Sequence, residues 1–124
     1  MFYVARIEKD QSRRKAMLTF IVAGAGFTGI ETMGELLEWR SALCREYGID
    51  SSEVRLMVVE AMGSILPILN ERLINKSERY MKKHGVEIIT SAPITEVKKE
   101  SIILRDGREI PTRTLIWTCS VQGK

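Results

Sequence analysis

Cysteine, histidine and long apolar runs are scarce in this sequence. Cys44 and Cys119 are its two cysteines, no CxxC pair is present, and His84 is the single histidine. A disulfide framework and a metal site are therefore not expected, which fits a reducing cytoplasm. No apolar run approaches the ~18 residues of a membrane-spanning helix. The start, MFYVARIEKDQSRRKA, is charged where a secretory signal would be apolar, so a cytoplasmic domain is predicted.

Charge of one sign does not dominate any long stretch either. The chain has 19 Lys and Arg against 16 Asp and Glu, a net charge of +3, and its basic residues fall in short groups at 13–15, 82–83 and 98–99. Acidic residues are interspersed, so these groups are interpreted first as solvated surface and second as a contact for an acidic partner. No contact with nucleic acid or with a membrane is expected of this chain.

The order of apolar segments predicts an α/β domain. LTFIVA is a buried-type strand, a helix is expected from Phe27 to Tyr47, and VRLMVVE, Val54 to Glu60, is a second strand. A second helix ends at KKHG, and VEII forms a third strand. The expected inner face of that second helix consists of Leu66, Leu69, Leu73 and Tyr80. Strands that alternate with helices indicate a parallel sheet with right-handed crossovers.

The next segment, ITEVKKESIILRDGREIP, has a different pattern. It holds three short alternating stretches with turns at Lys99-Glu100 and Asp106-Gly107, which is typical of an antiparallel meander. TLIWTC, Thr114 to Cys119, then returns as an apolar strand. The predicted fold is a Rossmann-like, three-layer α/β domain over residues 18–124, with the meander as the last crossover. Residues 1–17 are expected to be a linker or an N-terminal helix.

The stretch TFIVAGAGFTGIE places three glycines between the first strand and the first helix. Gly24 permits a tight turn, Gly26 lets a pyrophosphate approach the main chain, and Gly29 lets the helix pack close to the strand. The free N–H groups at the helix start would face the anion. Glycine turns also serve other purposes, but the strand before and the helix after this one favour nucleotide binding. The predicted pyrophosphate turn consists of Gly24, Ala25, Gly26, Phe27, Thr28 and Gly29.

An acid at the end of the second strand supports this interpretation. Glu60, which Ala61 follows, lies 31 residues after Gly29, and the long helix accounts for a spacing larger than usual. Its carboxylate would accept hydrogen bonds from the adenosine ribose and repel a 2′-phosphate, and no arginine follows in AMGS. NADH is therefore favoured over NADPH. The alternative is a solvated strand end.

Three further residues have open roles at this stage. Glu31 would face either the nicotinamide end of the ligand or water. Trp117 and Cys119 would lie at the carboxyl edge of the sheet, where ligands bind in open α/β folds. Core packing is favoured for Trp117, and a nucleophilic role is not expected for Cys119, which has no adjacent base or cation. No catalytic residue is predicted within this chain.

The order of motifs resembles the NADH-binding domain of type II NADH:quinone oxidoreductases, within the pyridine-nucleotide-disulfide reductase-like flavoproteins. The resemblance covers residues 18–123 and rests on GAGFTGIETMGEL, VVEAMGSILP, KKHGVEI, ILRDGREIP and LIWTCSVQG. In such enzymes NADH gives a hydride to FAD, and electrons pass to a membrane quinone. The resemblance implies that the three glycines bind the pyrophosphate, that Glu60 binds the ribose, and that Glu31 lies on the nicotinamide and flavin side.

The resemblance also implies that Thr118, Cys119 and Ser120 line the cofactor, although the family usually has Ala-Gly at the last two positions. The complete family has an earlier GxGxxG for FAD and a C-terminal part for the quinone, and this chain has one such motif. It therefore resembles an excised nucleotide-binding module that would not turn over alone. The parent enzyme would be peripheral, on the cytoplasmic face of a membrane.

Other functions remain open from sequence alone. The same module would serve a flavoprotein reductase for rubredoxin, ferredoxin or a disulfide. A non-catalytic NADH-sensing module is a further alternative, although no DNA-binding element accompanies it here. A methyltransferase would also use a glycine turn and a ribose acid, but the meander argues against it.

Overall fold

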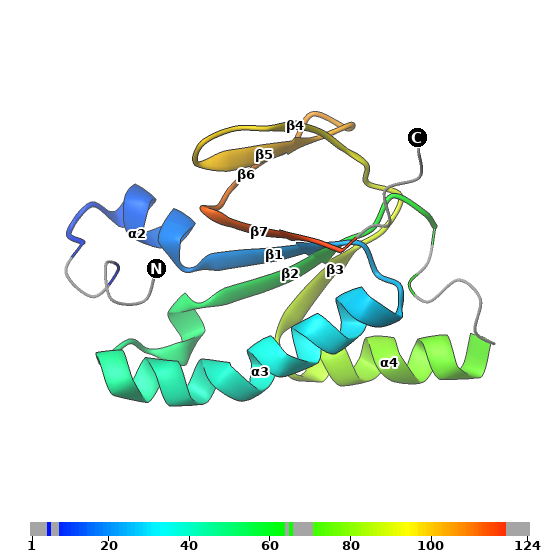
Figure 1. Cartoon of the computed structure of the whole chain (residues 1–124), viewed down its shortest axis with the longest axis horizontal. Helices are drawn as coiled ribbons and strands as arrows, with labels where there is room; N and C mark the ends of the chain where they lie inside the picture. The colour runs from blue at the N-terminus through cyan, green and yellow to red at the C-terminus, as the bar shows by residue number, and fades with distance from the viewer. Residues whose placement is uncertain (1–4, 6–7, 64, 66–70, 119–124) are drawn as a thin grey trace.

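The structure is a computed structural model that describes residues 5, 8–63, 65 and 71–118 (Figure 1). Its elements in chain order are α2 (Gln11–Met17), β1 (Thr19–Ala23), α3 (Phe27–Tyr47), a 3-10 turn (Ser51–Glu53), β2 (Arg55–Val59), α4 (Glu71–Lys83), β3 (Val86–Ile89), β4 (Ile94–Val97), β5 (Ser101–Leu104), β6 (Glu109–Pro111) and β7 (Thr114–Trp117). Among the described helices, none has the length and apolar character needed to cross a bilayer.

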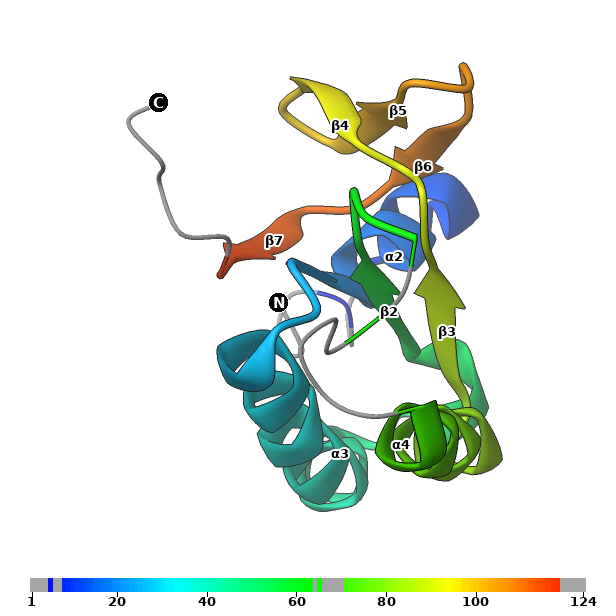
Figure 2. The same cartoon turned by 90° about the vertical axis from the view of Figure 1, so that its right-hand side faces the viewer.

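Two sheets and a helical layer build the domain. The first sheet has the strand order β3-β2-β1-β7 with parallel pairing throughout, and the second is the antiparallel meander β4-β5-β6. Figure 2 shows α3 and α4 together on one face of the parallel sheet and the meander over the other. The predicted three-layer, Rossmann-like fold with a meander as its last crossover is confirmed.

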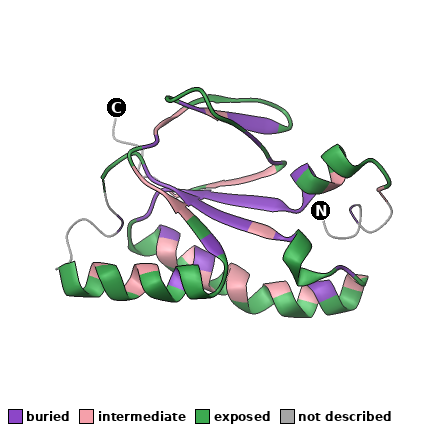
Figure 3. Ribbon diagram, turned by 180° about the vertical axis from the view of Figure 1, so that it is seen from behind, coloured by how far each residue is buried: buried purple, intermediate pink, exposed green. Residues whose placement is uncertain are grey.

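Strand β1 is buried along its whole length because both faces of the sheet are covered (Figure 3). Phe20 and Val22 point into the core against the helices, whereas Ile21 points into a second core under the meander. The same alternation in β2 sends Leu56 to the helix side and Met57 to the meander side. A continuous apolar run is therefore what these strands require.

Glycines mark both ends of α3. Gly26 is its N-cap, and Gly48 ends it in the left-handed conformation at φ 66°, with its N–H donated to the carbonyl of Cys44. A left-handed C-terminal residue is ordinary for glycine and strained for other residues. These flanking glycines are why both ends of the helix could be predicted from the sequence.

Three side chains differ from expectation. Tyr80 and Leu73 are 54% and 43% exposed on α4, because its inward face is formed by Met81, which is buried, and the partly buried Ile74, seven residues earlier. Trp117 is 53% exposed, so the prediction that it packs in the core is wrong. It ends β7, which is an edge strand of the parallel sheet that the described residues form. Leu66 and Leu69, the other residues predicted for the inner face of α4, lie outside the described residues.

Arg14 connects helix α2 to the rest of the domain through hydrogen bonds. Its guanidinium donates to both carboxylate oxygens of Glu53, at 2.8 and 3.0 Å, and to the carbonyl of Ala5 at 2.7 Å. The hydrogen bond from Arg14 holds the pKa of Glu53 below its ordinary value. Bidentate pairs of this kind are stronger than single contacts between charges.

We expect Glu53→Gln to lower the free energy of unfolding by about 1 kcal/mol or less at pH 7, because the pair is partly exposed. A carboxyl whose pKa is lowered by folding stabilises the native state above its unfolded pKa, and that contribution is lost as the pH falls through the folded pKa. Urea unfolding should therefore separate variant and parent at pH 7 and bring them together as the pH falls below the lowered pKa of Glu53. Glu38→Gln, at an exposed acid of α3, is the control; an equal loss there would contradict the assignment.

Candidate functional site

The glycine turn lies between β1 and α3, at the carboxyl edge of the parallel sheet. Gly24 has a φ of 106°, a conformation that few residues other than glycine adopt, and donates its N–H to the carbonyl of Val59 at 2.9 Å. A Cβ on Gly29 would lie 1.9 Å from the carbonyl oxygen of Gly24 and 3.0 Å from Oγ1 of Thr118. The start of α3 thus packs directly against the turn, which only glycine at position 29 permits.

The N–H groups of residues 26–29 have no hydrogen-bond acceptor within the part of the chain that the structure describes. The first helical hydrogen bond at this end runs from the N–H of Ile30 to the carbonyl of Gly26 at 3.0 Å, and no side chain caps the helix. A Cβ on Gly26 would meet no atom within 4 Å, so the space before these groups is open. Free N–H donors at the positive end of the helix dipole fit an anion such as a pyrophosphate.

Glu60 lies directly beside this turn and is 9% exposed. Its Oε1 accepts the N–H of Ala25 at 2.7 Å, and its Oε2 accepts the N–H of Met62 at 2.8 Å. Its backbone also bonds the strand and loop at β3, through the carbonyl of Ile89 and the N–H of Ala92. Glu60 therefore joins the glycine turn to the ends of two neighbouring strands.

Sequence reasoning missed this role of Glu60. The pairing of Ala23 with Val59 places the two strand ends side by side, which was available only once the register was known. Each carboxylate oxygen has a further lone pair, so a ribose hydroxyl could still donate to it. The predicted ribose contact is compatible with this geometry and stays a prediction.

Thr118 closes the turn from the other side. Its hydroxyl donates to the carbonyl oxygens of Ala23, at 2.9 Å, and Gly24, at 3.2 Å, and its N–H also donates to Ala23. Thr118 was predicted to line the cofactor, and the contacts that the structure gives it are those that hold the turn. Cys119 and Ser120, predicted beside it, lie outside the described residues.

The remaining predicted residues differ in exposure. Gly26, Phe27, Thr28 and Ala61 are exposed near the turn, and Ala25 is fully buried. Glu31 is exposed on α3, one turn beyond Gly26. The carboxyl edge thus brings together the glycine turn, Glu60 and Thr118, the residues on which the nucleotide prediction depends.

The described residues include neither a metal-binding cluster nor an exposed thiol. No group of three or more His, Cys, Asp and Glu among them is placed to hold a metal ion. Cys44 is buried in the core, and this burial raises the pKa of its thiol, which disfavours the nucleophilic thiolate.

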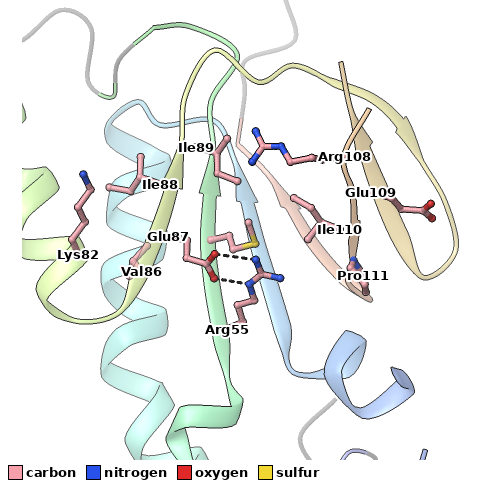
Figure 4. Close-up of a pocket in the computed structure, with 11 residues that line it drawn as sticks. Arg55, Lys82, Val86, Glu87, Ile88, Ile89, Arg108, Glu109, Ile110 and Pro111 are labelled. Carbon is pink, nitrogen blue, oxygen red and sulfur yellow. Dashed lines mark hydrogen bonds and ion pairs between the residues drawn. The ribbon is translucent and has the colours of Figure 1, made fainter. Parts of the chain in front are cut away.

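A separate hollow lies between β3 and β6 and contains none of the predicted site residues (Figure 4). On its wall the guanidinium of Arg55 donates to both carboxylate oxygens of Glu87, at 2.5 and 2.9 Å, and this hydrogen bond raises the pKa of Arg55. Ile89 and Ile110 supply apolar surface. The charges of Arg55 and Glu87 are thus paired with one another on this wall.

Comparison with known proteins identifies the family of this chain. Residues 2–123 match the family model for pyridine nucleotide-disulphide oxidoreductases. This chain belongs to that family. Among the family's proteins, a type II NADH:quinone oxidoreductase of Staphylococcus haemolyticus is 36% identical over 124 residues, covering 98% of this chain and 30% of that protein. The chain thus spans about a third of the length of that relative.

Solved structures share the fold of this pyridine nucleotide-disulphide oxidoreductase chain. The structure of NDH2 from Plasmodium falciparum in complex with NADH matches with a TM-score of 0.86 at 17% identity, over 96% of this chain and 27% of that one. A ferredoxin reductase from Rhodopseudomonas palustris matches with a TM-score of 0.66 at 17% identity, over 82% of this chain and 24% of that one. At these identities the likeness concerns the fold.

Proposed function

We propose that this chain is the NADH-binding part of a flavin-dependent NADH dehydrogenase. The observation that carries the proposal is the row of N–H groups at residues 26–29, which face open space beside the carboxylate of Glu60. When bound in the complete protein, NADH supplies a hydride, FAD accepts it, and electrons pass on to a quinone. The similarity to a type II NADH:quinone oxidoreductase supports this choice of reaction.

Each residue then has a binding role. The N–H groups of residues 26–29 hold the pyrophosphate, and Glu60 accepts a ribose hydroxyl while it keeps the turn in place. Thr118 fixes the carbonyls of the turn on the other side. Glu31 extends toward the nicotinamide and flavin, and Cys119 with Ser120 lines the cofactor. The FAD domain of the parent chain would complete the nicotinamide pocket, on an enzyme peripheral to the cytoplasmic face of the membrane.

A flavoprotein reductase with another acceptor is the second candidate. The ferredoxin reductase that matches in fold shows that the same architecture occurs with a protein acceptor. The two candidates share the nucleotide site and differ in the rest of the parent chain. Steady-state assays of the parent with quinone and with ferredoxin would separate them.

Calorimetric titration of the folded chain with NADH and NADPH tests the proposal. We expect NADH to bind more tightly than NADPH, because the carboxylate of Glu60 repels a 2′-phosphate. The chain alone should bind NADH without oxidising it, since its electron acceptor belongs to the FAD domain. If a folded chain binds neither nucleotide, and the parent enzyme also binds neither, the proposal is wrong.

We expect Gly26→Ala to separate nucleotide binding from folding. Its φ of −76° and ψ of −169° are allowed for alanine, and the new Cβ meets no atom of the protein within 4 Å. The free energy of unfolding should change by about 0.5 kcal/mol or less. NADH affinity should fall by about tenfold or more, because the Cβ occupies the approach of the pyrophosphate. Unchanged NADH affinity in this variant would place the phosphates elsewhere.

A further inference from the structure

Two of the basic groups in the sequence meet at one hollow, although more than 80 residues separate them. Arg13 and Lys15 of α2 lie on one side, and Lys98 and Lys99 of the β4–β5 turn lie on the other. Figure 1 shows α2 next to this turn. The hollow has a volume of about 630 Å³, is open to solvent, and is also lined by Ser12 and Ser101.

Most of the positive charge at this hollow is unpaired. Among the described residues, Arg13, Lys15 and Lys99 form no ion pair, and the ammonium of Lys98 lies 3.6 Å from Oε2 of Glu109. The hydroxyl of Ser101 donates to the same oxygen of Glu109 at 2.6 Å, and this hydrogen bond lowers the pKa of Glu109.

Two acids oppose these four cations. Glu109 is engaged by Ser101 and Lys98, and Glu100 is exposed in the β4–β5 turn. The lining therefore carries an excess of two positive charges, from four cations and two carboxylates. A ligand that neutralises this excess needs at least two negative charges.

The hollow is remote from the glycine turn. Helix α2 ends at Met17, just before the first residue of β1, whereas the glycine turn follows the last residue of β1. The two features thus lie at opposite edges of the parallel sheet, and a ligand at one leaves the other open.

We propose that this hollow binds a compact polyphosphate anion. Lysine and arginine side chains that approach from two sides match the spread of charge over adjacent phosphate groups. The hydroxyl of Ser12 adds a donor, whereas that of Ser101 is already donated to Glu109. The open mouth lets a larger molecule that carries the phosphates extend into solvent. The site lies outside the nucleotide site and holds whether or not NADH binds at the glycine turn.

Inorganic tripolyphosphate is the probe, and ¹⁵N chemical-shift mapping of the full 124-residue chain locates its binding. We expect saturable shifts at residues 12–15 and 98–101, separable from shifts that the anion causes at residues 24–29. The double variant Lys15→Gln/Lys99→Gln should weaken binding at the hollow about fivefold or more, as expected for the loss of two exposed ion pairs.

The matched control is Lys76→Gln/Arg79→Gln. These substitutions remove the same charge from the exposed face of α4, so they report general electrostatic attraction. Equal weakening in both double variants, or shifts confined to residues 24–29, would overturn the proposal. Co-sedimentation with phosphatidylglycerol vesicles that is lost in the first variant and kept in the control would support the same contacts, with a lipid headgroup as the source of the phosphate.

Discussion

Gly29→Ala is expected to destabilise the domain by about 3 kcal/mol or more and to abolish NADH binding. The added Cβ would lie 1.9 Å from the carbonyl oxygen of Gly24 and 2.9 Å from its carbonyl carbon. Both atoms belong to the backbone, so no side-chain rotation relieves the clash. Either the turn or the first turn of α3 must move, and each movement displaces the N–H groups that face the proposed pyrophosphate.

Gly34→Ala in the same helix is the control for this experiment. No atom lies within 4 Å of a Cβ at position 34, so alanine there should stabilise the protein by about 0.5–1 kcal/mol through its helix propensity. Urea unfolding and NADH titration of both variants give the comparison. Native stability and native affinity in Gly29→Ala would show that the helix start does not pack against the turn.

The fold could be predicted from sequence because its elements are defined locally. Helix α3 begins at Phe27 and ends at Tyr47 as predicted, since a glycine stands at each of its ends. The turn at Asp106-Gly107 was also predicted from its residue types. Gly107 adopts the positive φ of 97° that such hairpins require. The order of strands and helices along the chain was then sufficient to predict the parallel sheet and the meander.

The features that could not be predicted from the sequence depend on which side chains meet across the fold. Glu60 contacts the N–H of Ala25, 35 positions away, and Thr118 contacts Ala23, 95 positions away. The misjudged Trp117 has the same origin, because its burial depends on whether β7 has one neighbouring strand or two. For Leu73 and Tyr80, apolar spacing fitted a helix face that in the structure points away from the sheet. Apolar periodicity predicts well where a helix lies in the sequence. When the apolar residues are few, it predicts poorly which face of the helix turns toward the core.

Glu60→Ala is expected to cost about 2–4 kcal/mol of folding free energy and to weaken NADH binding strongly. The change leaves the N–H of Ala25, in a fully buried residue, and that of Met62 without the acceptors they have at 2.7 and 2.8 Å. A buried donor left without a partner costs about 1–3 kcal/mol. Because one of these donors belongs to the glycine turn, the loss of stability and the loss of nucleotide affinity have a common cause. A preference for NADH over NADPH should also fall by about tenfold or more, since the repelling charge is gone.

Glu60→Gln distinguishes the role of the carboxylate in the turn from its role at the ribose. The amide keeps one acceptor oxygen and presents an NH₂ group to the other backbone donor, so amide hydrogen exchange should accelerate at Ala25 or Met62. Glu87→Gln applies the same chemical change to a surface pair with Arg55, where about 0–1 kcal/mol is expected. If Glu60→Gln loses the NADH preference while the exchange of both amides stays native, Glu60 acts on the ribose alone. If exchange accelerates and affinities for NADH and NADPH fall together, Glu60 acts by holding the turn, and the ribose contact predicted from sequence is not made.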